Sequence, residues 1–207
     1  MKTINIYTDG ACSGNQSSQN KGGWACLLEL GDYKKIFAGN EANTTNNRME
    51  LKAVINAFEK IKASDYKVNI FTDSAYISNC INSRWYVKWL KDGWMNSKSP
   101  KENLDLWEEL LMYVAPDLLS NYIDTKKIRT TKHALSIGIS HTKFIHVPSH
   151  VSLKSSDEKL AEKYRKFLAS NKLTDKEYSL QDFLHIIEQN NIVDKRAVNA
   201  AEKITQT

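Results

Sequence analysis

Apolar and polar residues alternate in two short stretches of the chain that are nearly copies of each other. Residues 3–9 contain NIYTD, and residues 67–73 contain NIFTD. Period-two alternation predicts a β-strand in each stretch, and each predicted strand ends in an aspartate, Asp9 or Asp73. Neighbouring strands lie only about 4.8 Å apart, so pairing these two would bring their carboxylates together. Two carboxylates at such a distance repel unless a proton or a metal ion lies between them.

The rest of the pattern predicts a hairpin and a series of helices. Residues 24–30 and 33–39 alternate on either side of a Gly-Asp turn, which is typical of a β-hairpin. Helical spacing of apolar residues predicts a long helix over residues 49–62. Further elements are expected as helices from about residue 75, over 102–114 and over 157–169, and as a short strand over 143–148. Together they indicate an α/β fold with a mixed sheet.

Two stretches do not follow this pattern. Residues 115–142 are interpreted as a long insertion that carries a basic cluster, KKIRTTKH. From about residue 170 the composition changes, and both TDKE and SLQD have the spacing of a helix capping box. We therefore predict a C-terminal helical extension over residues 170–207. It is too short for a core of its own, so it is expected to dock on the main body or on a protein partner.

Composition is that of an ordinary globular protein, with 41% apolar and 26% charged residues. No apolar run approaches the roughly 18 residues needed to cross a bilayer, and the first residues show none of the apolar character expected of a secretory leader. Three scattered cysteines without CxxC spacing argue against a disulfide framework or a structural zinc site. We therefore expect a cytoplasmic monomer with no membrane partner. The formal net charge of +5 points weakly to an anionic partner.

Positive charge is concentrated between residues 84 and 101. Five cations face a single anion there, and three tryptophans lie among the cations; the residues are Arg84, Lys88, Lys91, Lys98, Lys101, Asp92, Trp85, Trp89 and Trp94. Cations with interleaved aromatic rings suit a sugar-phosphate backbone. An amphipathic helix with buried tryptophans and solvated lysines would give the same pattern. The segment alone leaves both interpretations open.

A third carboxylate, Glu50, falls in the first turn of the long predicted helix. Ala53 and Ala57 share its face at i+3 and i+7, so this side of the helix can lie close to the sheet. Asp9, Glu50 and Asp73 would then offer only oxygen ligands, which Mg²⁺ and Mn²⁺ prefer. Taken singly, each acid also has an ordinary explanation, as a turn residue, a first-turn acid or a helix N-cap.

Several motifs occur in the order of a known family. TDG, GGW, TNNRME and TDS resemble the type 1 ribonuclease H family, as do the tryptophan–lysine segment, NLDLW, VPSH and DEKLA. The resemblance covers residues 1–169 apart from 115–142. It implies a ribonuclease H-like fold with a five-stranded mixed sheet flanked by helices. Residues 1–169 would be the catalytic domain, followed by the extension over residues 170–207.

The resemblance also implies an endonuclease whose partner is an RNA–DNA hybrid. Such an enzyme hydrolyses the RNA strand and leaves 5′-phosphate and 3′-hydroxyl ends. Two Mg²⁺ ions, for which Mn²⁺ can substitute, would be held by Asp9, Glu50 and Asp73, with Asp9 bridging both. Family positions that bind substrate correspond to Cys12, Asn15, Thr45, Asn46 and Asn47, and in the basic segment to Trp85, Lys88, Trp89, Lys91 and Trp94.

The sequence departs from the family at its fourth carboxylate. The family places it two residues before a Leu-Ala pair, which is the position of Glu158, whereas the aspartate here is Asp157. A one-residue shift turns a helical side chain by about 100°, so both cannot serve equally. Because the loop after His150 is short, we predict Asp157 as the fourth catalytic and metal-binding residue. VPSH places His150 at the family's mobile catalytic histidine, and Ala75 replaces a glutamine that contacts the minor groove.

Three functions compete on these grounds: an active hybrid nuclease, a module that binds hybrids without cutting them, and a related integrase-like enzyme acting on DNA. In a binding module the three acids would repel both phosphate and one another. A DNA-specific enzyme leaves TNNRM and the tryptophan segment without a role. We therefore predict the hybrid nuclease.

Overall fold

The structure, a computed structural model, describes residues 2–14, 20–62, 65–94, 101–122 and 141–204. The strands are β1 (Lys2–Ser13), β2 (Lys21–Leu30), β3 (Tyr33–Ala42), β4 (Tyr66–Thr72) and β5 (Thr142–His146). The helices are α1 (Asn46–Glu59), α2 (Ala75–Asn82), α3 (Trp85–Lys91), α4 (Leu104–Val114), α5 (Pro116–Ser120), α6 (Asp157–Asn171) and α7 (Leu180–Glu202). No helix in these ranges is both long and apolar enough to cross a bilayer.

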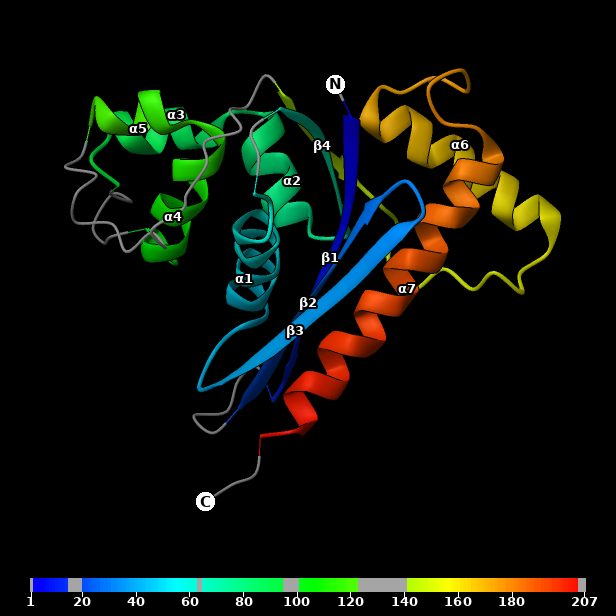
Figure 1. Ribbon diagram of the computed structural model, residues 1–207, viewed down its shortest axis with the longest axis horizontal. Helices are drawn as coiled ribbons and strands as arrows, with labels where there is room; N and C mark the ends of the chain where they lie inside the picture. Colours follow the sequence, from blue (N-terminus) through cyan, green and yellow to red (C-terminus); the bar gives the residue numbers. More distant parts are fainter. Residues whose placement is uncertain (1, 15–19, 63–64, 95–100, 123–140, 205–207) are drawn as a thin grey trace.

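The five strands form one mixed sheet in the order β3-β2-β1-β4-β5. The hairpin strands β1, β2 and β3 pair antiparallel, whereas β4 pairs parallel with both β1 and β5. Helices α1 to α5 lie on one side of the sheet, and α6 and α7 lie on the other (Figure 1). The predicted five-stranded mixed sheet with flanking helices is therefore confirmed.

Alternation along the strands divides the core between the two faces of the sheet. On β1, Ile6 packs in the core beneath α1 to α4, and Tyr7 packs in the core beneath α6 and α7. The Tyr7 ring stacks on Phe71 of β4 with 5.1 Å between ring centroids. The central strands β1 and β4 are therefore covered by helices on both faces of the sheet.

The prediction that both repeated strands end in aspartate holds to within one residue for β4 and is wrong for β1. β4 ends at Thr72, just before Asp73, but β1 continues past Asp9 to Ser13 because it stays paired with β2. The parallel ladder between β1 and β4 ends at Thr8 and Thr72. Both aspartates therefore follow the last paired residues of that ladder, which keeps them adjacent at one end of it.

Helix α1 begins earlier than the apolar pattern predicts. Thr45 is its N-cap and accepts a hydrogen bond from the Arg48 backbone N–H at 3.3 Å, so Glu50 lies in the second turn rather than the first. At the other end of the chain, Ser179 and Asp182 form the predicted capping box at the start of α7. TDKE forms a turn and no helix.

Helix α7 is the last element of the sheet's second layer. It lies across β1, β2 and β3 (orange to red in Figure 1) and contributes Phe183, Ile187 and Val193 to the core it shares with Tyr7. The predicted division at residues 169 and 170 falls inside α6. Residues 170–204 thus pack on the sheet itself.

Candidate active site

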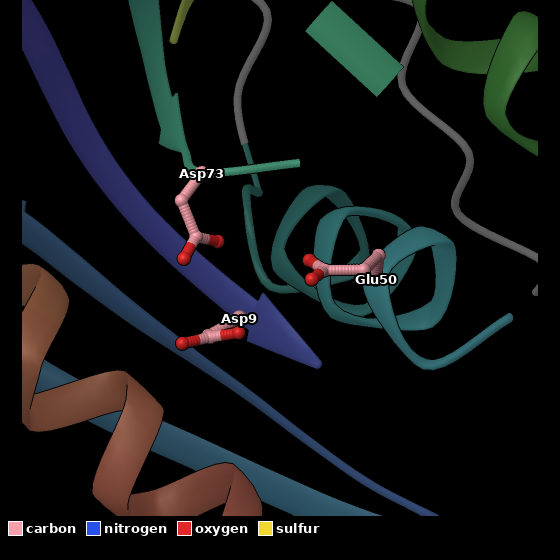
Figure 2. A group of neighbouring side chains, drawn as sticks. All are labelled: Asp9, Glu50 and Asp73. Atoms are coloured by element: carbon pink, nitrogen blue, oxygen red, sulfur yellow. The ribbon is translucent and has the colours of Figure 1, made fainter. Parts of the chain in front are cut away.

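Three carboxylates converge at the end of the ladder between β1 and β4. Asp9 comes from β1, Glu50 from α1 and Asp73 from the residue after β4, and their side chains point toward one another (Figure 2). Each offers a ligand oxygen, and these oxygens all lie within 4.8 Å of one another. Asp9 and Glu50 are buried, and Asp73 is partly buried. The three acids that were predicted to meet from the sequence do so.

Gly10 allows the helix to approach the strand this closely. A Cβ atom there would overlap the Glu50 backbone nitrogen and lie 2.7 Å from the Met49 carbonyl carbon. Since both atoms belong to the α1 backbone, no side-chain movement would relieve the overlap. The glycine next to Asp9 thus lets α1 pack directly on β1 and place Glu50 beside the aspartate.

Burial and mutual repulsion favour protonation of these acids when no cation is present. Burial, with the charges of Asp73 and Asp194, raises the pKa of Asp9 to about 8. Burial and the neighbouring aspartates raise the pKa of Glu50 well above its ordinary value, and burial also raises that of Asp73. Among the described residues, the buried oxygens Glu50 Oε2 and Asp73 Oδ1 have no hydrogen-bond partner. A group of hard oxygen ligands with unsatisfied atoms fits a divalent cation such as Mg²⁺ or Mn²⁺.

Asp194 of α7 is a fourth carboxylate at the rim of this group. Its charge raises the pKa of both Asp9 and Asp73, and its Oδ2 lies 3.8 Å from His150 Nδ1. A Cβ atom at Gly23 would overlap the Ala197 carbonyl oxygen and the Ala201 nitrogen. Helix α7 therefore packs on the β2 backbone, as α1 packs on β1.

Sequence reasoning missed Asp194, although a signal was present. Ala197 and Ala201 follow Asp194 at i+3 and i+7. The same spacing of alanines after Glu50 had indicated a helix face that lies close to the sheet. The residue was overlooked because α7 was interpreted as part of an extension outside the catalytic domain.

The structure places the predicted fourth carboxylate, Asp157, elsewhere. Asp157 and Glu158 are exposed at the start of α6, and Asp157 lines a surface pocket together with His185 and Glu188 of α7. Glu188 precedes Asp194 by six residues in α7, so the pocket that contains Asp157 lies about 9 Å along the helix from Asp194. Asp194 is among the charges that raise the pKa of Asp9 and Asp73, and Asp157 is not. Position therefore favours Asp194 over Asp157 as the fourth acid.

Two histidines border Asp73. His150 has a left-handed backbone (φ 50°) and a side chain that is 81% exposed, and its charge lowers the pKa of Asp73. His146, which was assigned no role from the sequence, lies with Nε2 3.2 Å from the Asp73 carbonyl oxygen. Asn171 bonds both backbone groups of His146 at 2.8 Å, its Oδ1 accepting from N–H and its Nδ2 donating to the carbonyl.

Most of the predicted substrate-binding loop lies next to the acids. Thr45 caps α1, Asn46 donates to Glu50 Oε1 at 3.4 Å, and Asn47 is exposed in the same turn. Cys12 is partly exposed at the end of β1, with its Sγ 3.7 Å from the Thr44 carbonyl oxygen. Asn15 lies outside the described residues. The polar groups around α1's first turn thus form one edge of the acid cluster.

The basic aromatic segment combines the two interpretations that the sequence left open. Trp94 is buried and packs against Trp89, which in turn packs edge-on against Trp107 of α4. Trp85 is 45% exposed, and Lys88 and Lys91 on the same helix α3 are also exposed. The prediction that Trp94 contacts substrate is corrected because its ring is enclosed by the core. Residues 123–140 of the predicted insertion, which include KKIRTTKH, lie outside the described residues.

Comparison with known proteins agrees with this geometry. The family model for RNase H matches residues 1–127. A ribonuclease H from Chlorobaculum parvum is 50% identical over 111 residues, which cover 53% of this chain and 73% of that protein. A ribonuclease H from Syntrophomonas wolfei is 45% identical over 130 residues, which cover 62% of this chain and 84% of that protein.

Solved structures show the same fold across the whole chain. LC9-RNase H1, described as a type 1 RNase H with the type 2 active-site motif, matches with a TM-score of 0.60 at 23% identity and covers 100% of this chain and 75% of its own. The solution structure of the PFV RNase H domain matches with a TM-score of 0.56 at 17% identity and covers 99% and 98%. The family model, the sequence identity and the fold therefore agree, and the chain belongs to the ribonuclease H family of nucleases.

Proposed function

We propose that the protein is an endonuclease that hydrolyses the RNA strand of RNA–DNA hybrids at the acid cluster and leaves 5′-phosphate and 3′-hydroxyl ends. The observation that carries this proposal is the convergence of Asp9, Glu50 and Asp73, whose ligand oxygens lie within 4.8 Å of one another. In a member of the ribonuclease H family, this arrangement supports metal-dependent phosphodiester hydrolysis.

The cofactor is proposed to be a pair of Mg²⁺ ions, for which Mn²⁺ can substitute. When bound, two such ions activate a water molecule and stabilise the leaving oxygen in an in-line displacement. Asp9 is proposed as the residue that would contact both ions. Glu50 and Asp73 would each help to hold them, and Asp194 would take the fourth position in place of Asp157, since its charge acts on two of the three acids.

His150 is assigned a role in proton movement and product release. Its side chain is exposed, so the imidazole can reach both solvent and the rim of the acid cluster. Asp194 lies near its Nδ1 and can stabilise the protonated ring. The left-handed backbone at His150 fixes the direction in which the side chain leaves the loop.

Recognition of RNA is assigned to the polar edge around α1. Hydroxyl, amide and backbone groups at Thr45, Asn46, Asn47 and Cys12 can meet phosphates and 2′-hydroxyls, and the 2′-hydroxyl distinguishes RNA from DNA. Trp85, Lys88 and Lys91 of α3 offer one ring and two cations to the other part of the duplex. The proposed substrate therefore lies between α1 and α3 over the three acids.

The decisive experiment is cleavage of a hybrid labelled on each strand in turn, with matched RNA and DNA duplexes as controls. Mg²⁺, Mn²⁺ and EDTA are compared for the wild-type protein and for Asp9→Asn. We expect metal-dependent cutting of only the RNA strand of the hybrid, lost in the variant, with end-group analysis giving a 5′-phosphate. A wild-type protein that binds the hybrid but cuts nothing with either metal would contradict the proposal and leave a binding module.

A further inference from the structure

Helix α6 lies in the stretch of 43 residues between His150 and Asp194, beyond the residues that match the family model. The helix flanks β5, the strand at the edge of the sheet. Its first turn is acidic, whereas from residue 159 onward cations predominate. The proposed active site and its substrate-binding edges include no residue of this cationic face.

Two surface grooves border β5, and cations line both. One groove lies between the end of β5 and α6 and includes His146, Pro148 and Phe167. The other lies along β5 itself and reaches the start of α3. Ser170 lines both grooves, so they form one continuous surface. We call its cations the basic band: Arg84, Lys143, Lys159, Lys163, Lys166 and Lys172.

The charge of the basic band is poorly balanced. Two carboxylates line the same grooves, and each holds one cation, Glu177 with Lys143 at 3.7 Å and Glu162 with Lys166 at 2.6 Å. The other four cations form no ion pair with any residue that the structure describes. Among the residues that the structure describes, six cations against two acids leave an excess of four positive charges on this surface, compared with +5 for the whole chain. Such a surface attracts a polyanion.

The basic band is continuous with the acid cluster at one end and with the basic segment at the other. His146 lines the first groove, and its ring lies 3.2 Å from the Asp73 carbonyl oxygen. Arg84 lines the second groove and is the N-cap of α3. A polyanion that leaves the acid cluster past Asp73 would therefore meet cations along the whole edge of the sheet.

We propose that the basic band is an additional substrate-binding surface that holds the sugar-phosphate backbone of the hybrid outside the acid cluster. This inference rests on the proposed function, because it takes the hybrid as the occupant. The apolar residues that line the grooves, Ile81, Phe144 and Phe167 among them, are buried members of the core. A protein partner would require exposed apolar anchors at the centre of its interface. Phosphates require only the cations.

The test compares two full-length variants that lose the same charge. Lys159→Gln/Lys163→Gln neutralises two unpaired cations of the basic band, and Arg165→Gln/Lys176→Gln neutralises two exposed cations that line neither groove. Hybrid binding is followed by fluorescence anisotropy in EDTA over a series of salt concentrations, so that the readout does not depend on cutting. Cleavage with Mg²⁺ is measured on a long and on a short hybrid.

We expect the basic-band variant to bind the long hybrid about tenfold more weakly at low salt. The slope of log affinity against log salt concentration should become shallower by nearly two units, because each lost phosphate contact removes roughly 0.9. Its KM for the long hybrid should rise while kcat and the cleavage of the short hybrid stay unchanged. The control variant should match the wild type in all of these.

Equal affinities and equal salt slopes for the two variants would overturn the inference while the wild type still cuts hybrids. Weaker binding of the basic-band variant to an acidic polypeptide, but not to the hybrid, would also overturn it and indicate a protein partner. Absence of any hybrid cleavage by the wild type would instead contradict the proposed function. The binding data in EDTA keep these two failures distinguishable.

Discussion

His150 Nδ1 lies 3.8 Å from Asp194 Oδ2, although 43 residues separate the two in the chain. The histidine comes from the loop after β5, and the aspartate from the middle of α7. Between them the chain forms α6, turns and crosses the sheet. This pair therefore exists only when α7 is packed on β2, and it joins the helical layer to the rim of the acid cluster.

The position of Asp194 predicts a difference between two conservative substitutions. Asp194→Asn should lower kcat for hybrid cleavage by roughly 10- to 100-fold, a range typical of groups that support a metal site, because it removes a charge next to Asp9 and Asp73. Asp157→Asn should leave kcat unchanged, since this side chain is exposed near the start of α7. Steady-state kinetics at saturating Mg²⁺ would measure both. A large loss in Asp157→Asn with none in Asp194→Asn would restore the original assignment.

The close approach of α7 to β2 predicts that Gly23 tolerates no side chain. A Cβ atom there would overlap backbone atoms of Ala197 and Ala201, so Gly23→Ala must push the helix away from the sheet. We expect a loss of about 2 kcal/mol in the free energy of unfolding, as for overpacked cores, together with a lower kcat as Asp194 moves. In the control Gly39→Ala, the added methyl meets the partly exposed side chain of Trp24 instead of the backbone of a packed helix. Urea denaturation should show a clearly smaller loss for the control.

The paired hydrogen bonds between Asn171 and His146 predict a local effect near Asp73. Asn171→Ala leaves the N–H and the carbonyl of His146 without their side-chain partners, which should cost about 1–3 kcal/mol. Hydrogen exchange of the His146 amide should accelerate, and kcat should fall because the ring next to Asp73 loses its support. Asn56→Ala, which removes a bond within α1, is the control and should leave that amide unchanged. Unaltered exchange in Asn171→Ala would refute the expectation.

Two tryptophans of the basic segment should have different roles: Trp94 should contribute to stability, and Trp85 should contribute to hybrid binding. Trp94→Ala removes a ring that is 4% exposed and should destabilise the fold by about 3–5 kcal/mol. Trp85→Ala removes an exposed ring and should leave thermal stability unchanged while weakening hybrid binding roughly tenfold, the effect of one lost stacking contact. Thermal unfolding and anisotropy would test the pair. Equal effects of both variants on stability would contradict this division.

The raised pKa of Asp9 predicts how stability changes with pH in metal-free protein. Because this pKa is about 8 in the fold and 3.8 in its ordinary state, the folded protein binds the proton more tightly. The resulting stabilisation is fully present below pH 3.8 and is lost as pH rises through about 8.

The neutral amide in Asp9→Asn should therefore stabilise the metal-free protein at about pH 8 by several kcal/mol, since each pKa unit corresponds to about 1.4 kcal/mol, with a matching rise in Tm, and give no gain in acid. Melting curves in EDTA across this pH range would measure the difference. Asp157→Asn, which alters an exposed carboxylate, serves as the control. A constant difference between Asp9→Asn and wild type at all pH values would contradict the prediction.

Local sequence patterns were sufficient where short stretches of chain determine the structure. The alternation in NIYTD and NIFTD, the hairpin turn at Gly31-Asp32 and the alanines after Glu50 each predicted an element or a face that the structure contains. The three acids could be brought together from these patterns because parallel pairing of β1 and β4 aligns their ends. The grouping of Asp9, Glu50 and Asp73 was therefore predictable from local sequence patterns, without knowledge of where α7 packs.

The remaining errors depended on contacts between distant parts of the chain. Asp194 reaches the acids only because α7 folds back over β2. The alanines that follow it indicate a helix face that packs closely, but they do not indicate which strand that face meets. The exposure of Trp85 and the burial of Trp94 depend on how α3 packs against α4, so the same local pattern fits both. The end of β1 was placed too early because its pairing with β2 continues beyond Asp9.

Two asparagines also determine where the sheet stops. Phe144 and His146 direct their backbone groups away from β4; Asn82 donates to the Phe144 carbonyl oxygen at 3.1 Å, and Asn171 engages both groups of His146. An open strand edge is a template for pairing with another chain and hence for aggregation. By supplying Asn171, α6 shields β5 from such pairing. A shortened chain without α6 is expected to lose this protection and to self-associate through its exposed edge.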